Sequence, residues 1–497
     1  MDKSIIIIGA GIAGLAAGCY ARMNGYRTQI FEMHNKPGGL CTSWKRKDYV
    51  IDGCLNWLVG SSPNNNFHQI WQELGALPGP QIIEHDIFIS IEDKSGKSFN
   101  VYTDIDRLEQ HMLDLAPQDR KAIQKFTNAV RDCTTVQLPI DKAPELYTAG
   151  DLPRLAAQML PFMKLMNSWK KVTVQDFSRE FKDPFLRHVF PLTFNLPGFP
   201  MMAVLMTLAW MNQKSAGFPQ GGSLEFSRSI ERRYLQLGGE LHYRSPVNRI
   251  LVSRGKAIGV RLANGINRHS DIVISAADGH ATLFQMLGGK YLTNKFRGYY
   301  RKMPIFPPLV QVSLGVSRSF EGVARLLLFP LKQPVTIAGK EETMMGVEIY
   351  NFDPTLAPPG KTVIEVKLFA DYDYWKNLKQ SPKSYREEKL KTAWQVIDLL
   401  EQRFPGLSRQ VEITDVATPM TWERYTGNWC ASFEGWLIST KNFGTSLRKT
   451  LPGLKNFYMC GQWVEPGGGV PSAALSGRNL IQVICKRDKK AFVAPTV

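Results

Sequence analysis

Six residues near the start of the chain have the types and spacing of a phosphate-binding loop. Gly9-Ala10-Gly11-Ile12-Ala13-Gly14 follows a short apolar run, residues 4–8, and opens a stretch with helical periodicity. The first glycine would permit a tight turn, the second would let a pyrophosphate approach the backbone, and the third would let helix and strand pack closely. The free N–H groups of the helix N-terminus would face the phosphates. The pattern predicts dinucleotide binding by Gly9, Gly11, Ile12, Ala13 and Gly14.

Glu32 is the acidic residue that completes such a motif. It comes at the end of the next predicted strand, which begins at Arg27 after a helix that Asn24-Gly25 stops. A carboxylate in this place can accept hydrogen bonds from both ribose hydroxyls, and it would repel a 2′-phosphate. Strand, glycine loop, helix, strand and acid therefore predict one β-α-β unit and argue against NADP as the nucleotide.

The residues after Glu32 narrow the class of dinucleotide. Met33 to Leu40 contains Gly38-Gly39 at the spacing found in two-dinucleotide-binding flavoproteins, and Tyr49 to Gly53 reads as the strand that follows. Two later segments, 217–224 and 457–471, also contain glycine clusters. Together these segments resemble the phytoene desaturase, carotenoid isomerase and retinol saturase family of FAD-dependent oxidoreductases, a branch of the amine-oxidase-like flavoproteins.

The resemblance implies FAD as the cofactor and adds further contact residues. Met33, Gly39 and Leu40 would lie along the cofactor, and Val247 would offer its backbone to the adenine. The segment 461–470 would wrap the flavin ring, and the helix after it would direct its N-terminus at the ring or the phosphates. The cofactor-binding residues implied in that segment are Gly461, Glu465, Gly469 and Val470.

The same resemblance implies a reaction. Exchange of a hydride between the flavin and a carbon of a long, apolar polyene would lead to desaturation, saturation or cis–trans isomerisation. The protein would contribute a dry tunnel and orientation more than acid–base groups. Glu465, beside the expected flavin ring, is the one catalytic candidate. The alternative for Glu465 is a structural partnership with a loop N–H group or with Arg478.

Two other functions stay open. A flavin amine oxidase shares the expected fold, but it would need an aromatic cage and an amine-sized pocket. A non-catalytic prenyl-lipid carrier, similar to the GDP-dissociation inhibitors, could use the same scaffold without needing Glu32. No second phosphate-binding loop follows the first, so we expect no nicotinamide-binding domain, and electrons would pass to or from a substrate, a quinone or oxygen.

The sequence lacks the signatures of several other chemistries. The 8 histidines and 7 cysteines show neither metal-ligand spacing nor a Cys-x-x-Cys pair, so we predict no metal site and no disulfide framework. Unpaired cysteines suit a reducing cytoplasm. No helix-turn-helix, zinc-finger or RNA-binding pattern accompanies the basic residues, so nucleic acid is not expected as a partner.

The elements that must position these residues predict an α/β protein with two interleaved domains. We expect a Rossmann-like, doubly wound FAD-binding domain from residues 1–75, 218–290 and 445–490. A mixed α+β substrate-binding domain is expected from residues 76–217 and 291–444. Within it, residues 104–210 read as a mainly helical insertion, broken by prolines such as Pro161, that forms a lid or a membrane contact.

The charge of the chain raises the question of a membrane partner. Lys and Arg number 61 against 44 Asp and Glu, which gives a net charge of +17. Leu152 to Lys171 combines basic and apolar residues, which suits an anionic membrane surface, but its Met-rich stripe would equally suit a tunnel wall or core. No apolar run is long enough to span a bilayer. We expect a cytoplasmic protein, with peripheral contact to the inner face of the membrane as an option. The sequence does not indicate the oligomeric state.

Overall fold

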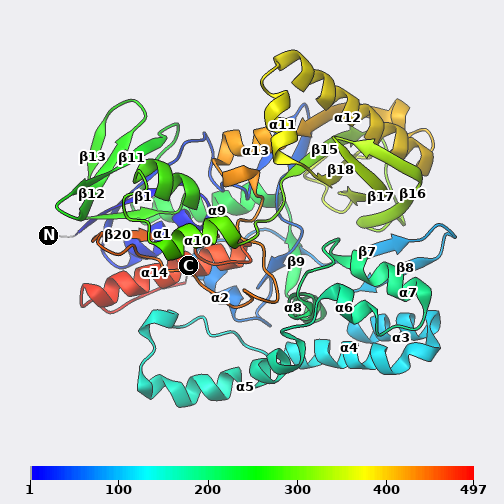
Figure 1. Cartoon of the computed structure of the whole chain (residues 1–497), viewed down its shortest axis with the longest axis horizontal. Coiled ribbons are helices and arrows are strands. Elements are labelled where there is room, and N and C mark those ends of the chain that lie inside the picture. Colours follow the sequence, from blue (N-terminus) through cyan, green and yellow to red (C-terminus); the bar gives the residue numbers. More distant parts are fainter. Residues whose placement is uncertain (1–2, 497) are drawn as a thin grey trace.

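Five parallel strands form the sheet that carries the predicted phosphate-binding loop (Figure 1). The computed structural model describes residues 3–496, so the first two residues of the expected FAD-binding domain lie outside the described residues. The strand order is β10-β2-β1-β14-β20, and β1 in the centre pairs in parallel with β2 and β14. The strands are β1 Ser4–Ile8, β2 Arg27–Phe31, β10 Glu240–His242, β14 Ile272–Ser275 and β20 Phe457–Met459.

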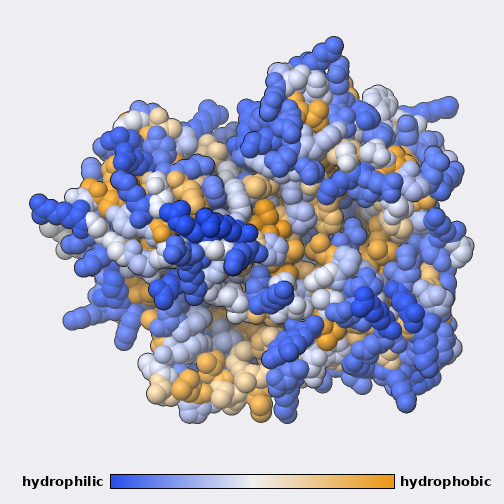
Figure 2. Space-filling view, in the orientation of Figure 1, coloured by the Kyte–Doolittle hydropathy of each residue, from blue (hydrophilic) through white to orange (hydrophobic). Residues whose placement is uncertain are grey.

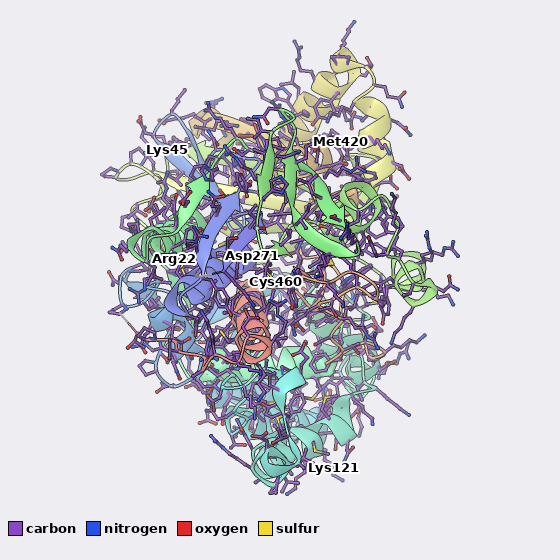
Figure 3. All side chains as sticks on the ribbon, turned by 90° about the vertical axis from the view of Figure 1, so that its left-hand side faces the viewer. Arg22, Lys45, Lys121, Asp271, Met420 and Cys460 are labelled. Atoms are coloured by element: carbon purple, nitrogen blue, oxygen red, sulfur yellow. The ribbon has the colours of Figure 1, made fainter. Side chains whose placement is uncertain are left out.

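Alternate side chains of β1 face two different layers. Ile5 and Ile7 pack against helices, whereas Ile6 and Ile8 pack against an antiparallel meander, because successive side chains of a strand point to opposite faces. The helices are α1 Ile12–Met23, α9 Gly222–Gln236 and α14 Val470–Arg487. The meander strands are β11 Val247–Ser253, β12 Lys256–Leu262 and β13 Asn267–His269. Figure 3 shows the green meander and the salmon helix α14 on opposite sides of the blue strands.

A second, seven-stranded sheet lies beside the parallel sheet in Figure 1. Its order is β19-β15-β18-β17-β16-β7-β8, and its pairs are antiparallel except β16 with β7. The strands are β7 Ile87–Glu92, β8 Ser98–Tyr102, β15 Leu309–Val316, β16 Leu326–Ile337, β17 Lys340–Ile349, β18 Thr362–Phe369 and β19 Val411–Ala417. Helices α11 Tyr372–Leu378 and α12 Pro382–Arg403 cover one side of it. The expected α/β class with a mixed second part is confirmed.

The insertion predicted at residues 104–210 is a helical layer below the seven-stranded sheet in Figure 1. Its helices are α3 Ile105–Leu115, α4 Arg120–Thr134, α5 Leu152–Trp169, α6 Val174–Ser178, α7 Pro184–Val189 and α8 Met201–Asn212. Pro161 does not end a helix as expected, because α5 continues through it. The residue four positions earlier, Ala157, is exposed, so water can reach the carbonyl group that loses its helical hydrogen bond.

Short elements connect these layers. The hairpin strands β3 and β4 link the phosphate-binding unit to the seven-stranded sheet, since Asp52 N of β4 donates to Glu365 Oε1 of β18 at 3.1 Å. The remaining strands and α-helices are β3 Ser43–Arg46, β4 Tyr49–Asp52, β5 Leu58–Val59, α2 Phe67–Glu73, β6 Ile82–Ile83, β9 Ala216–Pro219, α10 Asn294–Lys302 and α13 Pro419–Thr426. Among the described residues, no helix has the length and apolar content needed to cross a bilayer.

Helix α14 crosses α1 in close contact at Gly477. A Cβ atom at Gly477 would come within 2.7 Å of Ala13 O and 2.8 Å of Ala17 N. We therefore expect Gly477→Ala to force the helices apart and to lower the free energy of unfolding by about 1 to 3 kcal/mol. The measurement is the urea midpoint of the purified variant.

A glycine in another helix provides the matched control. A Cβ atom at Gly298 of α10 would meet no heavy atom within 4 Å. Gly298→Ala should stabilise the protein by up to about 1 kcal/mol, since alanine has the higher helix propensity. Equal effects of the two substitutions would show that the α1–α14 contact carries no packing constraint.

Candidate active site

A cavity of about 860 Å³ is lined by residues of both sheets. One wall comes from the carboxyl ends of the parallel strands, where open α/β sheets usually bind ligands. The opposite wall includes residues of β15, β17 and β18. The volume of the cavity lies in the upper part of the range usual for small-molecule sites.

The phosphate-binding loop forms part of the cavity wall. Gly9 has φ +96°, which other residues adopt only with strain. A Cβ atom at Gly11 would meet only Gly38 O, at 3.8 Å, so the space over Gly11 is open to a ligand. A Cβ atom at Gly14 would overlap Gly9 O, and Gly14 does not line the cavity. The first two glycines thus leave room for a pyrophosphate, and the third lets helix and strand pack.

Glu32 lies buried at the edge of this loop with 5% of its surface exposed. Its Oε2 accepts from Ala10 N at 2.6 Å, and its Oε1 accepts from His34 N at 2.8 Å. Burial raises the pKa of Glu32, although these backbone donors oppose the shift. Each carboxylate oxygen keeps a further lone pair, so the side chain can also accept two hydroxyl groups of a ligand in the cavity.

Most of the other predicted cofactor residues line the same cavity. They come from separate parts of the chain because β1, β2 and β20 end near the cavity and β11 begins there. The lining includes Gly9, Gly11, Ile12, Ala13, Glu32, Met33, Gly39, Leu40, Val247, Gly461, Gly469 and Val470. The chemistry of this donor set, open backbone at Gly11 and a buried acceptor at Glu32, fits an adenine dinucleotide.

Among the described residues, 3–496, Glu465 is not one of those that line the cavity. Its Oε2 accepts from Ser446 Oγ at 2.6 Å, and Lys449 Nζ is 3.3 Å from its Oε1. Arg478, the structural partner considered from the sequence, instead pairs with Glu73 at 2.9 Å. The geometry therefore gives Glu465 a structural ion pair with Lys449 and no contact with the cavity.

The seven-stranded sheet carries a buried ion network that was not predicted from the sequence. Lys367 Nζ lies 2.9 Å from Glu348 Oε2 and 3.3 Å from Glu365 Oε2. Burial raises the pKa of Glu365 to about 8. Burial acts in the same direction on Glu348, but Lys367 holds the pKa of Glu348 below its usual value. The only sequence signal is the placement of Glu365 and Lys367 on one face of an otherwise apolar strand, two residues apart.

Asp278 is a second missed carboxyl group in the cavity. It follows β14, and it accepts from Ala281 N at 2.6 Å and Trp429 N at 2.9 Å. Burial raises its pKa to about 7 despite these donors. The position of Asp278 after a parallel strand could have identified it as a site residue, because the carboxyl ends of parallel strands meet at one edge of the sheet.

Among residues 3–496, no group of three or more His, Cys, Asp or Glu side chains could hold a metal ion, and all seven cysteines are free.

Comparison with protein families identifies the class of cofactor. The model of the flavin containing amine oxidoreductases matches residues 12–484. The chain belongs to this family. A flavin held by an adenine dinucleotide motif is FAD, so the protein is an FAD-dependent oxidoreductase. This membership argues against the non-catalytic carrier, which would have no use for the flavin.

The similar curated proteins span nearly the whole chain. Prolycopene isomerase of Daucus carota is 23% identical and covers 96% of this chain and 79% of its own length. Phytoene desaturase (lycopene-forming) of Pseudescherichia vulneris is 24% identical and covers 96% of this chain and 98% of its own. 4,4′-Diaponeurosporene oxygenase of Staphylococcus aureus is 23% identical and covers 99% of each chain.

Solved structures share the fold. An oxidoreductase of Methanosarcina mazei has a TM-score of 0.60 at 18% identity and covers 96% of this chain and 100% of its own. Putrescine oxidase bound to putrescine has a TM-score of 0.60 at 12% identity, with 98% of this chain and 99% of its own covered. At these identities the likeness concerns the fold alone.

The carboxylate of Glu32 gives a test of the cofactor site. Glu32→Ala should weaken FAD binding by about 2 to 4 kcal/mol, because two charge-assisted hydrogen bonds are lost. The measurement is a titration of the apoprotein with FAD, followed by flavin fluorescence. Glu240→Ala is the control, since this carboxylate on the neighbouring strand β10 is exposed. Unchanged FAD affinity in Glu32→Ala would contradict the ribose assignment.

Proposed function

We propose that this FAD-dependent oxidoreductase acts on carbon–carbon bonds of a long, apolar polyene by desaturation, saturation or cis–trans isomerisation. The observation that carries the proposal is the agreement among full-length relatives. They are named for prolycopene, phytoene and 4,4′-diaponeurosporene, all long conjugated or partly conjugated hydrocarbons. Such substrates share little except length, apolar surface and double bonds.

The far part of the cavity suits such a ligand. Trp57 packs edge-on to Phe88 with ring centroids 5.5 Å apart, and Phe88 lies 5.4 Å from Phe194. The apolar side chains that line this part are Trp57, Phe88, Ile89, Leu192, Phe194, Leu326 and Leu328. Because a polyene offers few hydrogen-bonding groups, tunnel length and shape must decide selectivity, and each extra buried CH₂ adds only about 0.8 kcal/mol.

We propose a division of labour between the two parts of the molecule. Residues of the parallel sheet and its loops hold FAD, with Gly11 beside the pyrophosphate and Glu32 at the ribose. Residues of the seven-stranded sheet and the helical insertion bind and orient the substrate. When bound, FAD supplies the capacity to exchange a hydride. The protein excludes water from the apolar end of the cavity and holds protons on its buried carboxyl groups.

The substrate assignment is tested by anaerobic mixing. The oxidised and the dithionite-reduced holoenzyme are mixed with polyenes, fatty acids and simple amines while flavin absorbance and product geometry are followed. We expect a flavin response or polyene isomerisation with polyenes of neighbouring lengths, because shape alone selects among them. Rapid bleaching of the flavin by amines, with no response to polyenes, would establish the amine oxidase alternative instead.

We also propose that α5 docks on an anionic membrane surface. Leu152, Leu160 and Met163 expose 56%, 53% and 55% of their surface, and only Leu165 and Trp169 of α5 are buried. Figure 2 shows apolar surface gathered over this helix at the lower left. Lys164 and Arg154 on the same helix are exposed, and the chain carries a net charge of +17. Apolar side chains beside cations favour anionic lipid.

The same helix is continuous with the apolar wall of the cavity. Leu165 and Trp169 belong to a hydrophobic cluster that also contains Phe88 and Leu328, and Phe194 packs against it. Phe88, Leu328 and Phe194 line the cavity. The inner face of α5 therefore packs on the apolar side chains that form the cavity wall.

Sedimentation with liposomes tests the membrane proposal. The wild-type protein should sediment with anionic vesicles and come off at high salt, because salt screens the attraction. Leu160→Glu with Met163→Glu should abolish sedimentation. Leu390→Glu is the matched control, since Leu390 of α12 is also 56% exposed but lies on another helix. Equal recovery of the wild type in the supernatant with anionic and neutral vesicles would contradict the proposal.

A further inference from the structure

One carboxyl group in the cavity differs from the other five. Six carboxyl side chains line the cavity: Glu32, Asp278, Glu348, Glu365, Glu423 and Glu434. Four are held by the backbone donors or the lysine described above, and Glu423 accepts from Tyr372 OH at 3.1 Å. Within residues 3–496, Glu434 makes neither a hydrogen bond nor an ion pair through its side chain. It is half-buried by protein and faces the open space of the cavity.

Glu434 packs on the glycine segment that precedes α14. A Cβ atom at Gly468 would overlap Glu434 Cγ, and one at Gly469 would lie 3.3 Å from Glu434 Oε1. The two loops are tied together next to this contact, since Gly467 N donates to Trp436 O at 3.1 Å. Gly461, Gly469 and Val470 are the residues that we expect beside the flavin ring. Glu434 therefore stands next to the reacting part of the proposed cofactor site.

The surroundings of Glu434 let it hold and release a proton near neutral pH. The surrounding protein removes part of its hydration, and this desolvation raises its pKa to about 8. The titratable group on a facing element whose pKa Glu434 influences is the Cys54 thiol, which follows β4. No cation pairs with Glu434 among the described residues. The group is consequently neutral below pH 8 and an anion above it.

We propose that Glu434 is the acid–base group of the reaction, exchanging a proton with the substrate carbon next to the one that exchanges hydride. This inference rests on the proposed function. In saturation, one carbon of a double bond gains a hydride from reduced FAD, the π electron pair takes the proton of Glu434 at the other carbon, and the carboxylate remains. In desaturation, one carbon loses a hydride to oxidised FAD, the neighbouring C–H bond gives its proton to the carboxylate of Glu434, and its electron pair forms the double bond.

The first test needs no substrate. Ionisation of a carboxyl group beside the flavin changes the absorbance of the flavin, so the oxidised wild-type holoenzyme should show a spectral transition near pH 8. Glu434→Gln should lack this transition, and Glu434→Asp should keep it with a displaced midpoint, which separates the proton from any fault in folding. Glu465→Gln, which alters the rival carboxylate outside the cavity, should keep the wild-type transition. A wild type without the transition, or a transition that persists in Glu434→Gln, would overturn the proposal.

The second test uses the dependence of polyene turnover on pH. If Glu434 is the base of a desaturation, the rate rises through pH 8 as the carboxylate forms; if it is the acid of a saturation, the rate falls through the same pH. Either limb should vanish in Glu434→Gln and move in Glu434→Asp. A limb that persists in Glu434→Gln would refute the role. A wild-type enzyme that turns over no polyene would contradict the substrate assignment. The spectral titration would still decide the role of Glu434 in that case.

Discussion

The packing of Gly14 against the carbonyl group of Gly9 is the contact on which the rest of the site depends. No side chain fits between them, so the first turn of α1 lies directly against the end of β1. That placement leaves the backbone over Gly11 open and brings Ala10 N to the carboxylate of Glu32. The small residues of α1 then admit Gly477 of α14, whose N-terminus carries the glycine segment to the same cavity. One backbone contact therefore places three separate parts of the chain around the cofactor site.

Polar and apolar surfaces divide the cavity by the kind of element that supplies them. The cofactor side is mostly backbone and glycine, which suits phosphate and ribose groups. The seven-stranded sheet and the insertion supply aromatic and aliphatic walls, interrupted by the Lys367 network. Burial of that network is tolerable because each charge has a partner of opposite sign, and Glu365 avoids a charge by keeping its proton. Glu434 has no such partner, and this is what makes its proton available.

Helix α5 has one face packed in the protein and one face exposed to solvent. Its inner residues extend the apolar cluster behind the cavity, while Leu152, Leu160 and Met163 face outward beside basic side chains. Three large apolar side chains on one helix expose surface that would be costly in water, at about 25 cal/mol per Å². A bilayer would remove this cost and at the same time hold the substrate that the cavity suits.

The sequence by itself determined the nucleotide-binding unit and the α/β class. The loop from Gly9 to Gly14 and the acid at Glu32 belong to one local β-α-β unit, whose geometry follows from neighbouring residues. Which loop carboxylate faces the cavity was decided only by tertiary structure: Glu465 lies two residues before Gly467 in sequence, yet it turns toward Lys449, and Glu434 enters from a separate loop. Likewise, the pattern of α5 suits a core or a membrane equally, and only packing shows that nothing in the described chain covers its outer face. The physical reason is the same in both cases: periodicity and motif fix local conformation, but burial and side-chain direction depend on which distant segments pack alongside.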